Sequence, residues 1–145
     1  MTAKLLSPQE LRVWHAFRLL NEDVLGRVGD DIAQATGLSG SEFAVLSRLG
    51  ACHGELRQQD LARSLGWDKS RLSHQLKRME RRSLVERRSG GGKVVLVVMM
   101  EPGRKKLDRA RPVHAQSVRK NLLERISPKQ TAMIVRISNL LGDEP

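Results

Sequence analysis

Six cations lie within residues 69–82, in the segment KSRLSHQLKRMERR, and only one acid, Glu80, accompanies them. Lysine and arginine pair with phosphate, while arginine, serine and histidine also hydrogen-bond to the edges of bases. A surface that serves only solubility normally mixes both signs of charge. The segment therefore indicates contact with a polyanion, and nucleic acid is the first candidate.

The net charge of the 145-residue chain, +10, is concentrated around this segment. Residues 57–106 contain 14 Lys and Arg and 5 acids, a balance of +9, whereas the other 95 residues together carry +1. A localised basic block is the electrostatic footprint of a surface that binds a polyanion. A solvated basic surface is the alternative that composition alone leaves open.

If residues 68–82 form a helix, an apolar side separates from a polar side. At 100° per residue, Leu72, Leu76 and Met79 fall within about 60° of one another. A helix with a cationic outer face fits the major groove of B-DNA, which is about 12 Å wide. The side chains expected on or beside this face are Lys69, Ser70, Arg71, Ser73, His74, Lys77, Arg78 and Arg81.

The glycine-rich stretch RRSGGGKVVLVVMM, residues 87–100, raises the question of a phosphate-binding loop. It lacks the G-x-x-x-x-G-K-[ST] spacing, and an apolar strand-like run follows it instead of a helix. We therefore interpret the glycines as a hairpin tip, where glycine supplies the positive φ values that a tight turn needs.

Other reactive side chains form no motif. Cys52 is the only cysteine, so no intramolecular disulfide forms, and we interpret it as an inert residue in a loop. His15, His53, His74 and His114 show no ligand spacing such as i, i+4 and no neighbouring carboxylate or cysteine cluster. No nucleophile with a base and no pair of catalytic carboxylates is evident. We predict no metal, no cofactor and no enzymatic activity.

Capping signals predict a long first helix over residues 7–37. It opens with SPQE, a capping box with proline at the first helical position, and Gly37 suits its end. Its apolar residues recur at spacings of three and four and form one stripe. Because this stripe is too long for one small core, we expect part of it to meet a partner chain. Its members are Leu11, Trp14, Phe17, Leu20, Val24, Val28, Ile32 and Ala35.

The middle of the chain has the pattern of a helix-turn-helix. A second capping box, Ser39 with Glu42, opens a helix to about residue 49, and GACHGE then forms a loop. A brief strand at 56–57 precedes a short helix over 58–65. Gly66 and Trp67 break the chain before Asp68, an N-cap candidate for the helix that runs to about residue 82.

Two strands, 84–88 and 94–100, follow and are joined by SGGGK. We expect Pro102 and Gly103 to end the second strand, and a helix with a kink at Pro112 to run from 104 to about 126. A third capping box, SPKQ at 127–130, opens the last helix. Its apolar residues are Met133, Ile134, Ile137, Leu140 and Leu141.

The N-terminal residues lack the features of a signal peptide, and no apolar run approaches the roughly 20 residues of a membrane span. We expect a soluble cytoplasmic protein that does not bind membranes.

The segment LRQQDLARSLGWDKSRLSHQLKRMERRSLVERR, followed by a hairpin and a return helix, resembles the MarR family of winged helix-turn-helix transcription regulators. The resemblance implies a mainly α fold with a small β-hairpin wing. It assigns an N-terminal dimerisation helix (1–37), a DNA-binding lobe (38–101) and C-terminal dimerisation helices (102–145) as parts of one continuous domain. It also implies a homodimer that binds a pseudo-palindromic operator and represses or activates transcription under the control of a small ligand or a redox change.

The wing departs from the family pattern, which places an aspartate-x-arginine pair here with its arginine in the minor groove. The tip of this chain reads SGGGK, residues 89–93. Lys93 keeps the charge but lacks the planar guanidinium that suits a narrow groove. We therefore expect Arg87 and Arg88 to make more of the phosphate contacts.

We predict that each recognition helix enters a major groove, with half-sites about 10 bp apart. Ser70, Arg71, Ser73 and His74 are the candidates for reading bases. The candidates for phosphate contact are Lys69, Lys77, Arg78, Arg81, Arg57, Arg87, Arg88 and, at the wing tip, Lys93.

Trp14, Phe17 and Phe43 are the main aromatic side chains available to a ligand pocket, with core packing as the alternative role for each. Two rival functions share the basic block. A non-specific architectural DNA-binding protein would show a specificity ratio near one. A protein-interaction module would dock an acidic partner and would not bind DNA at low salt.

Overall fold

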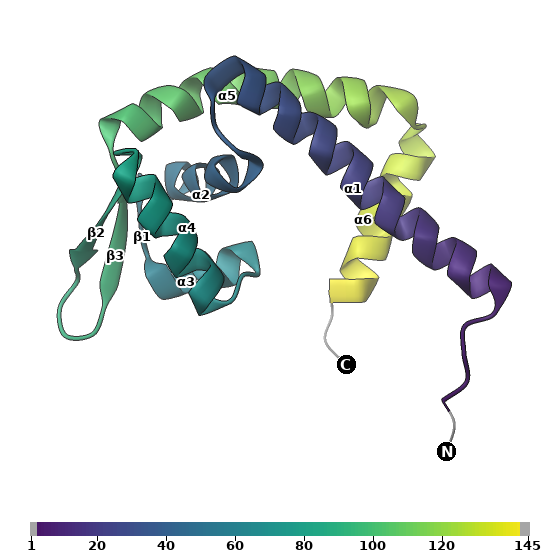
Figure 1. Ribbon diagram of the computed structural model, residues 1–145. Helices are drawn as coiled ribbons and strands as arrows, with labels where there is room; N and C mark the ends of the chain where they lie inside the picture. Colours follow the sequence, from purple (N-terminus) through teal and green to yellow (C-terminus); the bar gives the residue numbers. More distant parts are fainter. Residues whose placement is uncertain (1–2, 143–145) are drawn as a thin grey trace. The chain divides into compact units, whose positions relative to one another are not determined.

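The computed structural model describes residues 3–142 (Figure 1). Its elements follow the order α1 (Pro8–Thr36), α2 (Gly40–Ala51), β1 (Glu55–Arg57), α3 (Gln58–Leu65), α4 (Lys69–Arg81), β2 (Val85–Ser89), β3 (Val95–Met99), α5 (Glu101–Asn121), the 3-10 turn η1 (Leu123–Arg125) and α6 (Pro128–Gly142). The chain divides into two compact units: a central unit, residues 29–114, and a terminal unit, made of residues 1–28 and 115–145. The fold is mainly helical with a small antiparallel sheet, as the sequence predicts.

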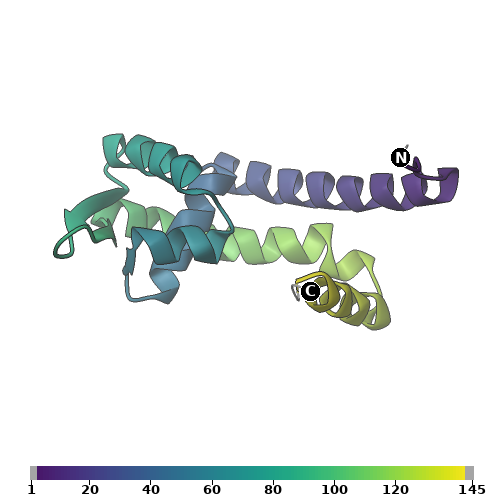
Figure 2. The same cartoon turned by 90° about the horizontal axis from the view of Figure 1, so that it is seen from below.

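All three predicted capping boxes are confirmed. In the first, Ser7 N–H donates to Glu10 Oε2 at 2.7 Å, and Glu10 N–H donates to Ser7 Oγ at 3.3 Å. Hydrogen bonds to the Glu10 carboxylate, first from the backbone N–H of Ser7 and then from its side chain, lower the pKa of that carboxyl. The boxes at Ser39 and Ser127 open α2 and α6 in the same way. Figure 2 shows α1 as one uninterrupted helix, and it ends at Gly37, whose φ is +75°.

The core of the central unit lies between α2, α3, α4, the start of α5 and the sheet. The largest fully buried side chains are Ile32, Leu38, Leu46, Leu49, Leu61, Leu72, Leu76, Met79, Leu84, Leu107, Val45 and Val97. The sheet has the order β1-β3-β2, and both neighbours of β3 are antiparallel to it. Since Val97 pairs with Leu56 on one side and Arg87 on the other, β3 is the central strand, and within it Val97 and Met99 are buried whereas Val95 is exposed.

The predicted helix-turn-helix is confirmed within one residue. Gly66 ends α3 in the left-handed region at φ +66°, and Trp67 N–H donates to Ala62 O at 3.0 Å. Asp68 then caps α4, because its Oδ1 accepts from Arg71 N–H at 2.8 Å. A backbone hydrogen bond therefore holds the turn at the end of α3, and a bond to the Asp68 side chain holds it at the start of α4.

The predicted second strand is confirmed within one residue at each end, but the predicted break at Pro102 and Gly103 is wrong, because α5 already begins at Glu101 and contains both residues. Proline is tolerated in a first helical turn, where its missing N–H has no intrahelical partner to lose. Gly103 allows the close approach of α5 to Leu84, the residue before β2, because a Cβ here would lie 2.3 Å from Leu84 O. The helix also ends earlier than expected, at Asn121, although it continues through Pro112.

The terminal unit buries few of its apolar side chains. Of the large hydrophobic side chains that are exposed in the described part of the chain, every one except Val95 belongs to this unit. Trp14 is 51% exposed and Phe17 48%, whereas Val28 and Ile32, farther along the same stripe, are buried. No helix within residues 3–142 is long and apolar enough to cross a membrane.

Candidate nucleic-acid interface

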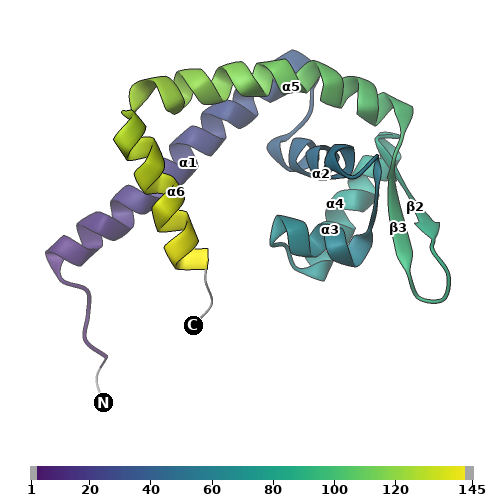
Figure 3. The same cartoon turned by 180° about the vertical axis from the view of Figure 1, so that it is seen from behind.

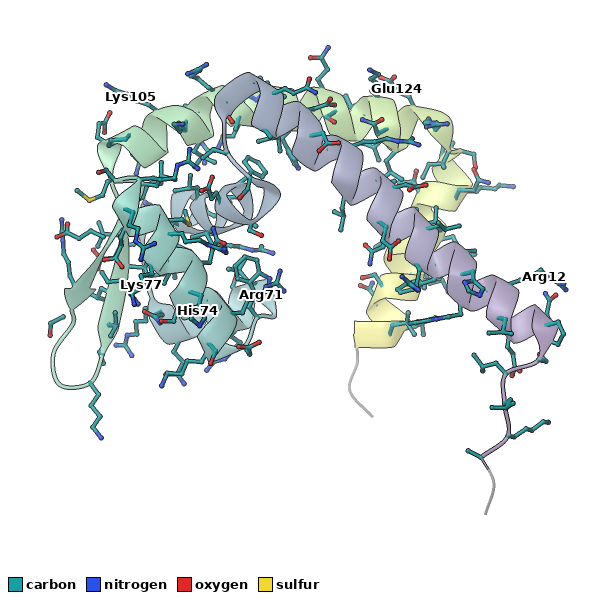
Figure 4. The ribbon with its side chains drawn as sticks, in the orientation of Figure 1. Arg12, Arg71, His74, Lys77, Lys105 and Glu124 are labelled. Atoms are coloured by element: carbon teal, nitrogen blue, oxygen red, sulfur yellow. The ribbon has the colours of Figure 1, made fainter. Side chains whose placement is uncertain are left out.

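Helix α4 carries a buried apolar side and an exposed cationic side. Leu72, Leu76 and Met79 are fully buried in the central unit. The exposed residues on the other side are Lys69, Ser70, Arg71, His74, Lys77, Arg78 and Arg81. Figure 4 shows Arg71, His74 and Lys77 along this outward face. The structure therefore brings together the predicted recognition residues on one helix, with Ser73 half-buried at its edge.

Arg71 makes two contacts, the first of which is the hydrogen bond from its backbone N–H to the capping residue Asp68. Its guanidinium carbon lies over the ring of Trp67, 4.2 Å from the ring centroid. Trp67 is half-buried and precedes the helix, in the turn after α3. A cation over an indole face is attracted by the ring's quadrupole. This contact orients an arginine in the first turn of the helix, where major-groove contacts are usually made.

Arg87, predicted for phosphate contact, lies in an ion pair between the sheet and α4. Its Nη2 is 2.7 Å from Glu80 Oε1, its Nε donates to the same oxygen at 2.8 Å, and its Nη1 donates to Ser73 Oγ at 3.3 Å. Both partners of the pair are about two-thirds or more covered. Arg87 therefore joins β2 to the recognition helix, and this role was not visible in the sequence.

Arg88 is about half exposed and pairs with Glu86 on its own strand, at 3.0 Å. Arg82, which the sequence does not place in the site, follows α4 and binds Glu42 of α2, with Nη1 2.5 Å from Oε1. The two residues are 40 positions apart, so sequence spacing gives no signal for the pair. The C-terminal end of α4 is thus fixed to the start of α2.

A hollow of about 500 Å³ opens between α3, α4 and the wing. Its lining brings together three predicted cations, Arg57, Lys69 and Lys93, from three different segments. The rest of the lining consists of Gln58, Gln59, Ala62, Leu72, Val94 and Val95. Gln58 Oε1 is buried and has no hydrogen-bond partner among the described residues. The hollow extends the positive surface of α4 toward the wing.

The wing tip is a tight turn, and the interpretation of its glycines is confirmed. Gly90 N–H donates to Val94 O at 2.8 Å, and Val94 N–H donates to Gly91 O at 3.1 Å. Gly91 and Gly92 have φ values of +97° and +57°, which a residue with a Cβ rarely adopts. Figure 3 shows this turn as the free end of the hairpin, and Lys93 within it is exposed.

The remaining candidates lie outside this surface. Trp14 and Phe17 stack on each other in the terminal unit with centroids 6.2 Å apart, whereas Phe43 packs against His114 in the central unit at 4.8 Å. Cys52 is exposed at the end of α2. Within residues 3–142, no three His, Cys, Asp or Glu side chains are grouped so that they could hold a metal ion.

Residues 36–93 match the model of the MarR family. This range begins at the end of α1 and contains α2, the helix-turn-helix and the wing up to Lys93. None of the curated proteins matches the chain.

Among solved structures, AbsC, a MarR family transcriptional regulator from Streptomyces coelicolor, is 26% identical with a TM-score of 0.86, and the match covers 97% of this chain and 96% of AbsC. Sco3205, a MarR family regulator from the same organism solved in complex with DNA, is 22% identical with a TM-score of 0.87, covering 97% and 90%. The organohalide-sensing regulator RdhR-CbdbA1625, solved with 2,4-dichlorophenol, is 16% identical with a TM-score of 0.81, covering 97% and 88%.

The family match includes every residue predicted to contact DNA, and the fold shared with AbsC extends over 97% of the chain. Over residues 36–93 the chain is therefore similar to the MarR family of winged helix-turn-helix transcriptional regulators, and it shares the fold of a solved member of that family over nearly its whole length.

Proposed function

We propose that this protein binds double-stranded DNA as a homodimer, with sequence specificity, and regulates transcription from a pseudo-palindromic operator. The observation that carries the proposal is the two-sided character of α4. Its apolar side is locked into the core of the central unit, while its exposed side offers donors and cations in one row. A rigid helix of this kind matches the major groove in shape and in charge.

The position of each side chain supports a division of roles. Ser70, Arg71 and His74 lie exposed in the first two turns of α4, where base edges are in reach, and Ser73 lies beside them. The cations expected to meet phosphates are Lys69, Lys77, Arg78, Arg81, Arg57, Arg88 and Lys93. Arg87 differs from these cations, because its guanidinium is held in an ion pair with Glu80. It therefore contributes to this surface chiefly through that pair.

The apolar surface of the terminal unit supports the homodimer. Monomeric proteins rarely expose large contiguous apolar patches. Here, exposed apolar side chains occur in both α1 and α6, the segments to which the family resemblance assigns dimerisation. A second copy of the same surface would cover them, because an isologous interface is self-complementary. A dimer would also supply two copies of α4, as an operator with two half-sites requires.

We further propose that a small molecule regulates the DNA affinity by changing the distance between the two recognition helices. RdhR-CbdbA1625 shares the fold and binds 2,4-dichlorophenol. Trp14, Phe17 and Phe43 remain the proposed aromatic contacts for such a ligand. As a regulator of transcription, the protein would act in the cytoplasm, with the DNA.

The test is selection of bound fragments from a random DNA pool, followed by anisotropy titrations of the selected site over a salt series. We expect a preference of at least about 10³ over random DNA and a steep loss of affinity with salt, because counterions are released. Light scattering of the free protein should give twice the 16.3 kDa chain mass.

Each rival function has a distinct outcome in the same experiment. Binding without preference for any sequence would support an architectural protein. No binding at low salt, together with a monomeric mass, would support a protein-interaction module.

A further inference from the structure

Among the arginines of the DNA-facing surface, Arg71 differs in what holds its guanidinium. Arg87 and Arg88 bind carboxylates, Glu80 and Glu86. The Arg71 guanidinium instead lies against the ring face of Trp67, at 4.2 Å. A carboxylate occupies the N–H donors of an arginine and cancels its charge, whereas an aromatic face does neither. Arg71 is therefore held in place with its donors and its charge available.

Both ends of this contact are fixed by the backbone. Trp67 is anchored by the end of α3, where its N–H donates to Ala62 O at 3.0 Å and Gly66 adopts the left-handed conformation. Arg71 is anchored at the start of α4, where its N–H donates to Asp68 Oδ1 at 2.8 Å. The tryptophan ring is therefore a platform at a defined position beside the first turn of the recognition helix.

A planar guanidinium presents donors in a fork that matches O6 and N7 of guanine, and this bidentate pair is the commonest specific contact in the major groove. Holding the side chain before binding reduces the entropy lost when the pair forms. We propose that Trp67 is a positioning residue that directs Arg71 to a guanine in each half-site of the operator. This inference rests on the proposed function, and it names one base and the two residues that select it.

The test uses the operator selected by the wild-type protein, with every position of one half-site replaced in turn by the other three base pairs. Binding is measured for the wild type and for Arg71→Ala, Arg71→Lys, Trp67→Phe and Trp67→Leu. Leucine keeps an apolar side chain without a ring, and phenylalanine keeps an aromatic face. Lys105→Ala, which removes an exposed cation of α5, is the control for loss of one charge.

We expect a wild-type preference for guanine of about 5- to 150-fold at one position. In R71A this preference should vanish while preferences at other positions remain, and R71K should not restore it. W67L should lower affinity about 3- to 10-fold for the guanine site alone, and W67F should recover most of that loss. Replacing the guanine by 7-deazaguanine, which lacks N7, should weaken the wild type but not R71A.

The coupling between the two residues separates a positioning role from a general structural one. If Trp67 acts through Arg71, W67L should have no further effect in the R71A background. A full additional loss in that background, or an equal loss for all four base pairs, would overturn the proposal. An Arg71 variant that weakens every sequence equally and reduces the salt slope by about one would also overturn it, by making Arg71 a phosphate contact. Absence of any sequence preference in the wild type would instead reject the proposed function itself.

Discussion

Arg82 and Glu42 join the end of the recognition helix to the first turn of α2. Arg82 Nη1 lies 2.5 Å from Oε1 and 2.6 Å from Oε2 of Glu42, and its Nη2 donates to Gly37 O at 3.3 Å. The Glu42 side chain is only 7% exposed, and Oε2 also accepts from Ser39 N–H at 3.0 Å. One carboxylate therefore serves both the capping box of α2 and the orientation of α4.

Removal of the arginine should leave this carboxylate buried without its cation. Breaking a fully buried pair costs about 3–5 kcal/mol. Because the Arg82 side chain is 40% exposed, solvent screening reduces the expected cost of Arg82→Ala to about 1–3 kcal/mol. Urea unfolding at fixed protein concentration measures this cost. Arg18→Ala, which breaks the exposed pair with Glu22, is the matched control and should change the free energy of unfolding by no more than about 0.5 kcal/mol. Equal effects of the two substitutions would show that the Arg82–Glu42 pair contributes no more to the free energy of unfolding than an exposed ion pair does.

Arg87 and Arg88 are adjacent in sequence but should give different defects. Arg87→Ala removes the contacts with Glu80 and Ser73, so we expect a loss of about 1–2 kcal/mol in stability and weaker binding to all DNA sequences. Glu80→Gln should reproduce much of the stability loss, although it removes no positive charge. Arg88→Ala should leave stability nearly unchanged and reduce the salt slope of DNA binding by about one. Thermal unfolding combined with a salt series distinguishes these effects, and an Arg87 variant of normal stability would contradict the assignment.

Local sequence signals predicted the caps, the wing turn and the two sides of α4. Local signals were sufficient where they act within a few residues: the boxes at Ser7 and Ser39, the cap at Asp68 and the glycines of the wing tip all gave the observed geometry. Periodicity likewise separated the buried and exposed sides of α4. These signals suffice because capping and amphipathicity depend on short spacings along the chain.

Contacts between distant segments were not predictable in the same way. The pairs Glu42–Arg82 and Glu80–Arg87 depend on how elements pack, and the charged residue types are equally consistent with DNA contact. The start of α5 differs from the prediction because Pro102 and Gly103 usually indicate a break. Their actual role depends on the close approach of Gly103 to Leu84 O, which only the tertiary structure reveals.

That approach predicts an intolerance of any side chain at position 103. The Cβ of Gly103→Ala would lie 2.3 Å from Leu84 O, a backbone atom, so α5 or β2 has to shift. We expect a destabilisation of more than about 2 kcal/mol, within the range for overpacking of a rigid site. Gly26→Ala is the matched control, because position 26 lies in the interior of α1 and an added methyl group would meet nothing within 4 Å. That substitution should stabilise the protein by about 0.5–1 kcal/mol, since alanine favours a helix interior. Comparable unfolding midpoints for the two variants would contradict the close contact.

The wing tip can be tested separately from the recognition helix. Lys93 is exposed in a glycine turn and lines the hollow together with Arg57 and Lys69. Lys93→Ala should reduce the salt slope by about one for each wing that contacts a phosphate, without changing the base preferences. Lys93→Arg should preserve the slope, and a gain of preference for a narrow minor groove would indicate that arginine enters it. If neither affinity nor salt slope changes in K93A, the wing tip makes no contact with DNA.

Deletion of residues 127–145 tests the proposed dimer through the helix that contributes many of its exposed apolar side chains. Met133, Ile134, Val135, Ile137, Leu140 and Leu141 of α6 are all at least 43% exposed in the single chain. If a second copy covers them, the deletion removes apolar contact area and leaves the apolar side chains of α1 without a partner. We expect a monomeric or aggregating protein by light scattering. Its affinity for a two-half-site operator should fall at least about 100-fold, while its affinity for a single half-site changes little.

The helix-turn-helix should stay folded, because its core lies in residues 29–114. A truncated protein that still dimerises and binds the full operator normally would show that α6 is not part of the interface.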